Sequence, residues 1–158
     1  MRPLLDWSNS ILSINSSPLR IGDGVSKEVS FDAESIKRYA TLADDLSPYH
    51  HDEKFAASSR FGGLIASGTQ TFAMMFGAAA SFMATIGPSL GLESTARFRR
   101  PMRAGDVGRI EWRVTSIEDK PGLNGSIITL EGRLVRGDGE LAVIATNKSL
   151  LLPPGTQL

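Results

Sequence analysis

The 158-residue chain contains no cysteine. This absence excludes disulfide bridges, thiolate metal ligands and a cysteine nucleophile, and it is typical of proteins in a reducing compartment. The first residues include an acid, Asp6, and no apolar run long enough for a signal peptide, so we expect a cytoplasmic protein. A chain of this length removes roughly two-thirds of its unfolded surface from water, which predicts one domain over residues 1–158.

The chain also lacks net charge, because its 17 basic residues balance its 17 acidic residues. A neutral chain has no overall field that would favour nucleic acid or an anionic membrane as its partner. Only the uncharged run between Arg60 and Glu93 is long enough to suggest a membrane span. Glycine and polar residues interrupt this run and leave about four helical turns, whereas a span needs about 20 apolar residues. We therefore expect a buried helix of a soluble domain and no membrane partner.

Signals for a helix start occur at three places. Asp32 can cap the free amides of a first turn while Phe31 packs on Ile36. Asp52 can cap a second, shorter helix. A third helix, opening near Ser67, is apolar on nearly every face, so we expect other elements to wrap it. The three predicted helices cover about residues 32–42, 52–58 and 67–84.

The rest of the chain is typical of strands. Ile110, Trp112 and Val114 alternate with polar residues, which is the period of a half-buried strand. Turn sequences at 120–125 and 137–139 predict that the last three strands form an antiparallel meander. A strand, helices and then a run of strands predict an α+β domain in which an antiparallel sheet wraps the long helix. The predicted strands are 26–29, 93–98, 107–117, 126–136 and 141–151.

Both histidines of the chain lie in one loop with three acids, and the loop contains Asp44, Asp45, His50, His51 and Asp52. A carboxylate and an imidazole held together can position and polarise a water, which is general acid/base chemistry without a metal. The alternative interpretation is that the acids cap helix ends and the histidines lie on a solvated loop. A zinc site is disfavoured, because adjacent histidines in one loop lack the usual ligand spacing.

A second candidate site is the start of the long helix, at Gly68. An amide without a helical partner points outward there with the positive end of the helix dipole behind it, and a glycine lets a substrate oxygen approach. Such a position suits a developing oxyanion. The alternative is a glycine that only gives the backbone freedom.

Three segments together resemble the MaoC-like (R)-specific enoyl-CoA hydratase/dehydratase family. Residues 39–52 are similar to the family's hydratase motif, with an aromatic residue, an Asp, a Pro and a His in the same order. Residues 61–69 are similar to the entry of its central helix, and residues 97–106 to its aromatic, Pro and Gly-Asp segment. The matches occur in the family's order from residue 31 to about residue 151.

The resemblance implies a hot-dog fold and a hydro-lyase that converts a trans-2-enoyl thioester reversibly to an (R)-3-hydroxyacyl thioester. It maps the catalytic pair onto Asp45 and His50, with a water between them that attacks the β-carbon. The Gly68 amide would hold the thioester oxygen, and Ser67 beside it would influence which acyl chain fits. No metal and no cofactor are implied, apart from the coenzyme A or acyl carrier of the substrate. Homodimers or dimers of dimers, with the acyl pocket near the interface, are also implied.

The sequence departs from the family at several positions. Asp44 stands where many members have Gly or another acid, and Ser47 stands where many have Asn, although its side chain can still bond the loop backbone. Phe76, where some relatives carry a small polar residue, would shorten the acyl pocket. We expect His51 to face solvent.

The sequence leaves two alternative functions open and suggests one further contact with the substrate. A hot-dog thioesterase would use a single carboxylate, and a non-catalytic subunit would bind the acyl thioester without turnover. Arginine forks suit phosphates, so four arginines are candidates to meet coenzyme A, although an arginine-lined strand edge is more often only solvated. These are Arg97, Arg99, Arg100 and Arg103.

Overall fold

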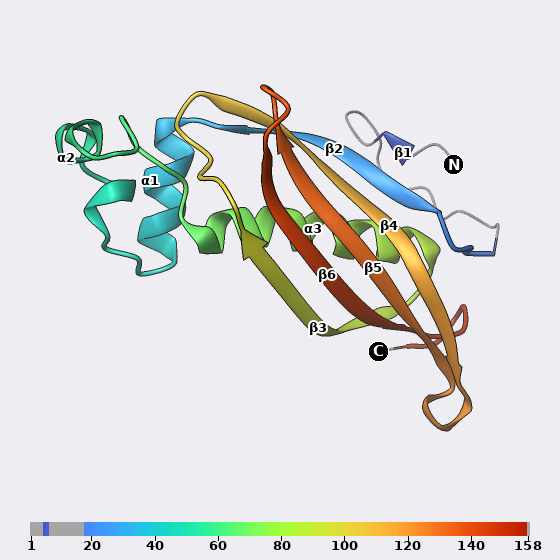
Figure 1. Ribbon diagram of the computed structural model, residues 1–158. Coiled ribbons are helices and arrows are strands. Elements are labelled where there is room, and N and C mark those ends of the chain that lie inside the picture. The colour runs from blue at the N-terminus through green and yellow to red at the C-terminus, as the bar shows by residue number, and fades with distance from the viewer. Residues whose placement is uncertain (1–4, 7–17, 158) are drawn as a thin grey trace.

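The computed structural model describes residues 5–6 and 18–157. Within them, six strands form one sheet in the order β1-β2-β4-β5-β6-β3, and Figure 1 shows this curved sheet beside the long helix α3 (Gly68–Ile86). Neighbouring strands are antiparallel, except that β1 and β2 run parallel. The strands are β1 (Leu5–Asp6), β2 (Gly24–Phe31), β3 (Ser89–Phe98), β4 (Asp106–Lys120), β5 (Gly125–Arg136) and β6 (Leu141–Leu151). This is the predicted hot-dog arrangement.

The meander of β4, β5 and β6 is confirmed, whereas β3 is longer than predicted. It begins at Ser89 and not at Glu93. Its register with β6 shifts between Gly91 and Glu93, so Leu92 is an extra residue in the strand. Such a bulge interrupts the alternation of side chains. The first half of β3 therefore shows no strand pattern in the sequence.

Side-chain caps start all three α-helices, and those at Asp32 and Asp52 were predicted. The Asp32 carboxylate accepts the Ser35 amide hydrogen at 2.8 Å, and this hydrogen bond lowers the pKa of Asp32 because it favours the charged form. Asp52 and Ser67 cap their helices in the same way, at 3.0 and 3.1 Å. The helices are α1 (Ala33–Leu42), the 3-10 turn η1 (Pro48–His50), α2 (Glu53–Ser58), α3, and the 3-10 turn η2 (Pro121–Leu123).

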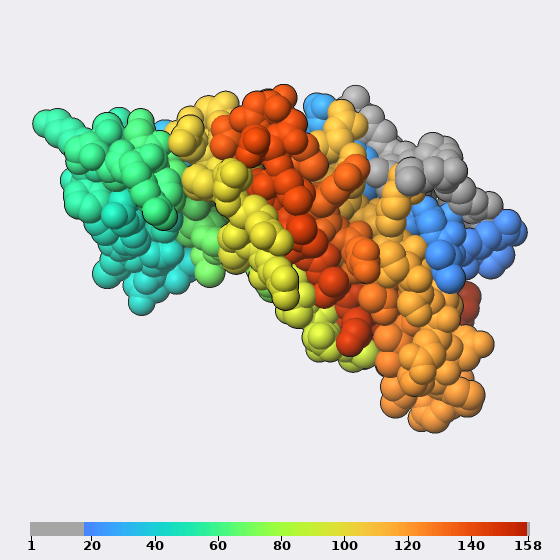
Figure 2. All heavy atoms as spheres, viewed as in Figure 1, coloured from blue at the N-terminus to red at the C-terminus, as the bar shows by residue number. Residues whose placement is uncertain are grey.

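The segment from α1 to α2 projects beyond one end of the sheet, as Figures 1 and 2 show. It connects β2 to α3 in the chain, so the loop that carries both histidines lies near the N-terminal end of α3. Among the described residues, no helix is long and apolar enough to cross a bilayer.

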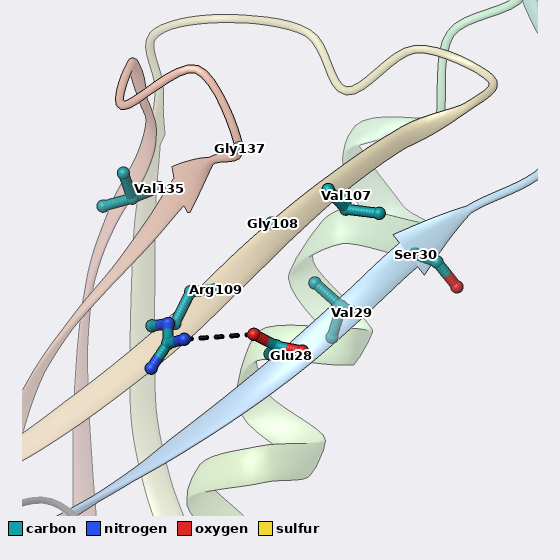
Figure 3. Close-up of a pocket in the computed structure, with 8 residues that line it drawn as sticks. All are labelled: Glu28, Val29, Ser30, Val107, Gly108, Arg109, Val135 and Gly137. Carbon is teal, nitrogen blue, oxygen red and sulfur yellow. Dashed lines mark hydrogen bonds and ion pairs between the residues drawn. The ribbon is translucent and has the colours of Figure 1, made fainter. Parts of the chain in front are cut away.

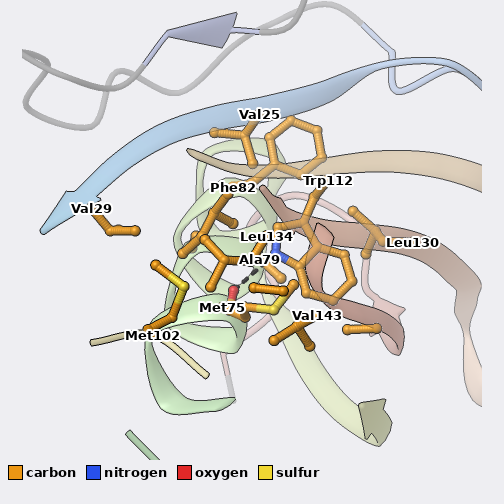
Figure 4. Packing of buried hydrophobic residues seen from close by; sticks show 14 of the residues in the cluster. Val25, Val29, Met75, Ala79, Phe82, Met102, Trp112, Leu130, Leu134 and Val143 are labelled. Atoms are coloured by element: carbon orange, nitrogen blue, oxygen red, sulfur yellow. Dashed lines mark hydrogen bonds between the residues drawn. The ribbon is translucent and has the colours of Figure 1, made fainter. Parts of the chain in front are cut away.

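Trp112 on β4 joins the sheet to the helix. Its indole Nε1 donates to the Met75 carbonyl oxygen of α3 at 2.9 Å, and the side chain is fully buried (Figure 4). Gly132 on β5 lies directly opposite in the register. A Cβ atom added at Gly132 would come within 2.5 Å of the indole ring. Because no side chain fits beneath Trp112, the glycine allows the ring to lie flat between sheet and helix.

The sheet covers α3 on one side only. Met75, Ala79 and Phe82 are buried against it, whereas Ala73, Gly77, Ala80 and Ala84 form an exposed stripe of small residues. The prediction that other elements wrap this apolar helix therefore holds for its sheet-facing side. The small stripe is left uncovered by the described part of the chain.

We expect Gly132→Ala to lower the free energy of unfolding by about 1–3 kcal/mol, because the added methyl group overpacks the site beneath Trp112. Urea denaturation followed by tryptophan fluorescence measures this. The matched control is Gly122→Ala, where an added Cβ meets nothing within 4 Å, and we expect a change within about 0.5 kcal/mol. Equal stabilities for the two variants would contradict the packing described above.

Candidate active site

The loop that carries the acids and histidines begins with a sharp reversal at the end of α1. Asp44 adopts a φ of 54°, in the left-handed region that usually favours glycine. The next amide, that of Asp45, then donates back to the Ala40 carbonyl oxygen at 2.9 Å. A glycine would adopt this backbone conformation without steric cost. The reversal places the Asp45 side chain beside η1, which carries His50.

Asp45 and His50 meet, as predicted. The distance from His50 Nε2 to Asp45 Oδ2 is 3.5 Å, and His50 is 8% exposed while the Asp45 side chain is 33% exposed. On the other side of the ring, Nδ1 lies 2.8 Å from the Ile65 carbonyl oxygen. A carbonyl oxygen only accepts hydrogen bonds, so the ring proton belongs to Nδ1.

In the neutral ring, Nε2 therefore presents a lone pair to the Asp45 carboxylate, which also accepts. Two acceptors at this separation do not bond each other directly. A water molecule placed between them would donate one hydrogen to each, and it would reach the pair from the more exposed Asp45 side. Such a geometry can orient a water molecule and accept a proton from it.

Two neighbours fix the Asp45 carboxylate and its backbone. The Ser47 amide donates to Asp45 Oδ1 at 3.2 Å, which leaves Oδ2 for His50. His51 Nε2 lies 2.7 Å from the Asp45 carbonyl oxygen. The prediction of a solvent-facing His51 is wrong, because the 3-10 turn rotates its ring back onto the loop. Ser47 contributes its amide to the loop, and its side chain makes no capping hydrogen bond.

Gly68 is the first residue of α3, as expected, and the catalytic loop is tied to the segment before it. The Ile65 amide donates to the Tyr49 carbonyl oxygen at 3.2 Å, and the Ile65 carbonyl oxygen is the one that contacts His50 Nδ1. Ser67 is 1% exposed, and its hydroxyl lies 3.0 Å from Thr69 Oγ1 besides capping the helix. The Ser67 side chain thus lies behind the helix start, whereas Gly68 is exposed.

A small cavity of about 240 Å³ opens at Gly68. The Phe98 ring packs over the glycine, and an added Cβ would lie 3.5 Å from its nearest carbon, which is ordinary contact. Arg99 and Arg100 belong to the cavity wall, and Arg100 also pairs with Glu140 at 3.1 Å. A thioester oxygen at the Gly68 amide would therefore have arginines close by. No group of three or more metal-binding side chains is present in the described ranges.

A separate cavity of about 380 Å³ lies between β2 and β4 (Figure 3). Its polar side chains are chiefly Glu28 and Arg109, which pair with each other at 3.0 Å. Both groups are thereby satisfied, and the candidate catalytic residues lie elsewhere. We do not assign this cavity to the active site.

The chain was compared with known proteins. The family model described as MaoC like domain matches residues 19–129. The (R)-specific enoyl-CoA hydratase of Aeromonas caviae is 30% identical over 131 residues, which cover 82% of this chain and 93% of that protein. The 3-hydroxybutyryl-CoA dehydratase of Methylorubrum extorquens is 30% identical over 94 residues, or 58% of this chain and 56% of that protein.

A solved structure agrees with these sequence matches. The structure of the (R)-hydratase from A. caviae involved in PHA biosynthesis superposes with a TM-score of 0.74 and 29% identity. The superposition covers 87% of this chain and 100% of the A. caviae chain. The similarity in fold therefore extends over most of the chain.

The left-handed backbone at Asp44 gives a prediction about the loop. Asp44→Gly removes the steric penalty of a positive φ and should keep or raise the free energy of unfolding, by up to about 1 kcal/mol. Asp44→Val places a β-branched side chain in the same conformation and should lower it by about 1–2 kcal/mol. Thermal denaturation ranks the three proteins, and a valine variant as stable as the glycine variant would contradict the reversal.

Proposed function

The chain belongs to the MaoC-like domain family, and from that membership we propose that it is a hydro-lyase acting on acyl thioesters. The reaction is the reversible hydration of a trans-2-enoyl thioester to an (R)-3-hydroxyacyl thioester. The names of the two relatives, a hydratase and a dehydratase, describe the two directions of this chemistry. The observation that carries the proposal is the pair of facing acceptors, His50 Nε2 and Asp45 Oδ2, 3.5 Å apart.

In the hydration direction, the water held by both groups attacks the β-carbon of the enoyl chain. As the new carbon–oxygen bond forms, Asp45 takes one proton from the water while His50 holds the other hydrogen. The electron pair of the double bond moves toward the thioester oxygen and gives an enolate. Return of the proton from Asp45 to the α-carbon completes the addition of one water and restores the carboxylate.

The Gly68 amide is the proposed donor to the enolate oxygen. Its N–H is one of the amides that lack a partner inside α3, and the helix dipole adds positive potential there. Ser67 acts as a positioning residue, because its hydroxyl fixes the first turn in which this amide lies. Arg99 and Arg100, with Arg97 and Arg103 on the same stretch, are the proposed contacts for the phosphates of a coenzyme A carrier.

A thioesterase is the second candidate, and it needs only one carboxylate to activate water. The geometry favours hydration, because both Asp45 and His50 Nε2 are turned toward the same point. Incubation with crotonyl-coenzyme A distinguishes the candidates. Loss of the enoyl absorbance indicates hydration, release of free thiol indicates hydrolysis, and neither change indicates a binding protein.

We also propose that two copies of the chain pair as a homodimer. β3 ends the sheet on one side, and Leu90 and Leu92 on it are 46% and 52% exposed. The exposed small-residue stripe of α3 adds an apolar surface that a second helix can approach closely. The cytoplasmic location stays a prediction from the cysteine-free sequence.

Replacing either member of the pair should abolish most activity. We expect Asp45→Asn and His50→Ala each to lower kcat/KM for crotonyl-coenzyme A hydration by at least about a hundredfold, the usual scale for an acid/base group. The matched control is Asp52→Asn in the same loop, because asparagine also caps a helix, and it should keep activity. If His51→Ala loses at least about a hundredfold in activity while His50→Ala stays active, His51 and not His50 acts with Asp45.

Gly68→Ala tests the oxyanion role separately from folding. The Phe98 ring leaves room for the methyl group, so the variant should melt near the wild type. Turnover should fall by about a hundredfold to a thousandfold, because the methyl group displaces the thioester oxygen from the amide. Gly122→Ala in η2, away from this helix and with nothing within 4 Å of the new Cβ, is the control. Wild-type turnover in Gly68→Ala would remove this amide from the mechanism.

A further inference from the structure

A cavity of about 1200 Å³ lies along the C-terminal half of α3, beyond Phe76. Its walls come from α3, from β3 and β6, and from the residues after β6. Among the described residues, no charged side chain lines it. Most of the lining is apolar, including Phe76, Met83 and Leu151, as expected for a space that receives a hydrocarbon chain.

Three polar side chains interrupt the apolar wall at one place. On the core-facing side of β6, Val143 and Ala145 are followed by Asn147 and Ser149, which are 7% and 5% exposed. Asn147 Nδ2 donates to Ser94 Oγ of β3 at 3.0 Å, and Ser149 Oγ donates to Asn147 Oδ1 at 2.8 Å. We call Ser94, Asn147 and Ser149 the polar trio.

The hydrogen bonds within the polar trio use only part of its capacity. The second Nδ2 hydrogen of Asn147 and the hydroxyl hydrogen of Ser94 have no acceptor within the described part of the chain, and Ser149 Oγ keeps free lone pairs. Gly91 lies opposite Ser149 in the register, and a Cβ there would meet nothing within 4 Å. The space in front of the trio is therefore open to a ligand.

The spare donors and acceptors suit a neutral oxygen. A hydroxyl group can both donate to and accept from the trio, and a keto oxygen can accept from its two donors. A carboxylate is disfavoured, because the lining offers no cation to compensate its charge. A plain hydrocarbon end would leave the second Nδ2 hydrogen of the buried Asn147 without a partner once it displaced water.

Ser94 of the trio lies on the same face of β3 as Phe98, which packs over Gly68. Ser94, Ala96 and Phe98 point to one side of the strand, because side chains alternate. Phe98 packs over Gly68, and Ser94 lines the large cavity. The two positions are about 13 Å apart along an extended strand. An acyl chain that lay along this face, with its thioester at Gly68, would bring its distal part to the trio.

We propose that the polar trio binds a neutral oxygen, a hydroxyl or keto group, on the distal part of the acyl chain. The substrate class is thus an oxygenated, medium-length trans-2-enoyl thioester. This inference rests on the proposed function, since it assigns a substrate to that same reaction. The trio acts on specificity, and the acid/base chemistry stays with Asp45 and His50.

The test compares three substrates with the wild-type protein: crotonyl-coenzyme A, trans-2-decenoyl-coenzyme A and ω-hydroxy-trans-2-decenoyl-coenzyme A. The kcat/KM for the hydroxylated chain should exceed that for the plain chain by roughly five- to tenfold, the worth of one neutral hydrogen bond. Equal values for the two long substrates, with crotonyl-coenzyme A hydrated, overturn this inference alone. No hydration of any substrate overturns the proposed function and this inference with it.

Variants locate the effect in the trio. Asn147→Leu replaces the amide by an apolar group of similar size, and it should abolish the preference for the hydroxylated chain while crotonyl hydration is kept. Ser94→Ala, at the exposed rim, is the milder second variant and decides the matter if Asn147→Leu does not fold. Thr146→Val is the matched control, because Thr146 bonds Thr95 on the opposite face at 2.6 Å. An unchanged preference in Ser94→Ala and in folded Asn147→Leu overturns the assignment.

Discussion

The hydrogen bond from the Trp112 indole to the Met75 carbonyl fixes α3 against the sheet, and the arrangement of the rest depends on it. The bond is 2.9 Å long and fully buried, and the ring lies flat only because Gly132 has no side chain. A buried indole N–H without a partner is costly, so rotation or sliding of the helix is disfavoured. With its middle fixed in this way, α3 presents Gly68 to the catalytic loop at one end and lines the large cavity at the other.

The candidate acid/base pair depends on backbone groups more than on side chains. The Ile65 carbonyl sets the tautomer of His50, the Ser47 amide occupies one Asp45 oxygen, and the Asp45 carbonyl holds His51. The Ser47 and His51 contacts arise within the reversal that begins at Asp44, whereas the Ile65 carbonyl comes from the segment before α3. A loop built in this way keeps a carboxylate and an imidazole 3.5 Å apart without placing either in a hydrocarbon core.

Local patterns predicted the caps at Asp32 and Asp52 and the start of α3 near Ser67, because a helix start depends on residues only a few positions apart. The alternation around Trp112 likewise predicted β4. The first half of β3 was missed, since the extra residue Leu92 interrupts the alternation. The contact of His51 was missed as well, because the orientation of adjacent histidines depends on a 3-10 turn. Asn147 and Ser149 lie in a strand that was predicted, but no local signal says that their face closes a cavity.

The proposed acid/base pair and the large cavity belong to different parts of the chain. Asp45 and His50 belong to the segment that projects from the sheet, whereas β3 and β6 line the cavity along the distal half of α3. Mutational effects at positions more than about 7–10 Å apart, with no shared partners, usually add. Under the proposed roles, substitutions on β6 would therefore change the preferred acyl group without disturbing the Asp45–His50 pair. Duplicated copies of such a gene can diverge in substrate while they keep a single reaction.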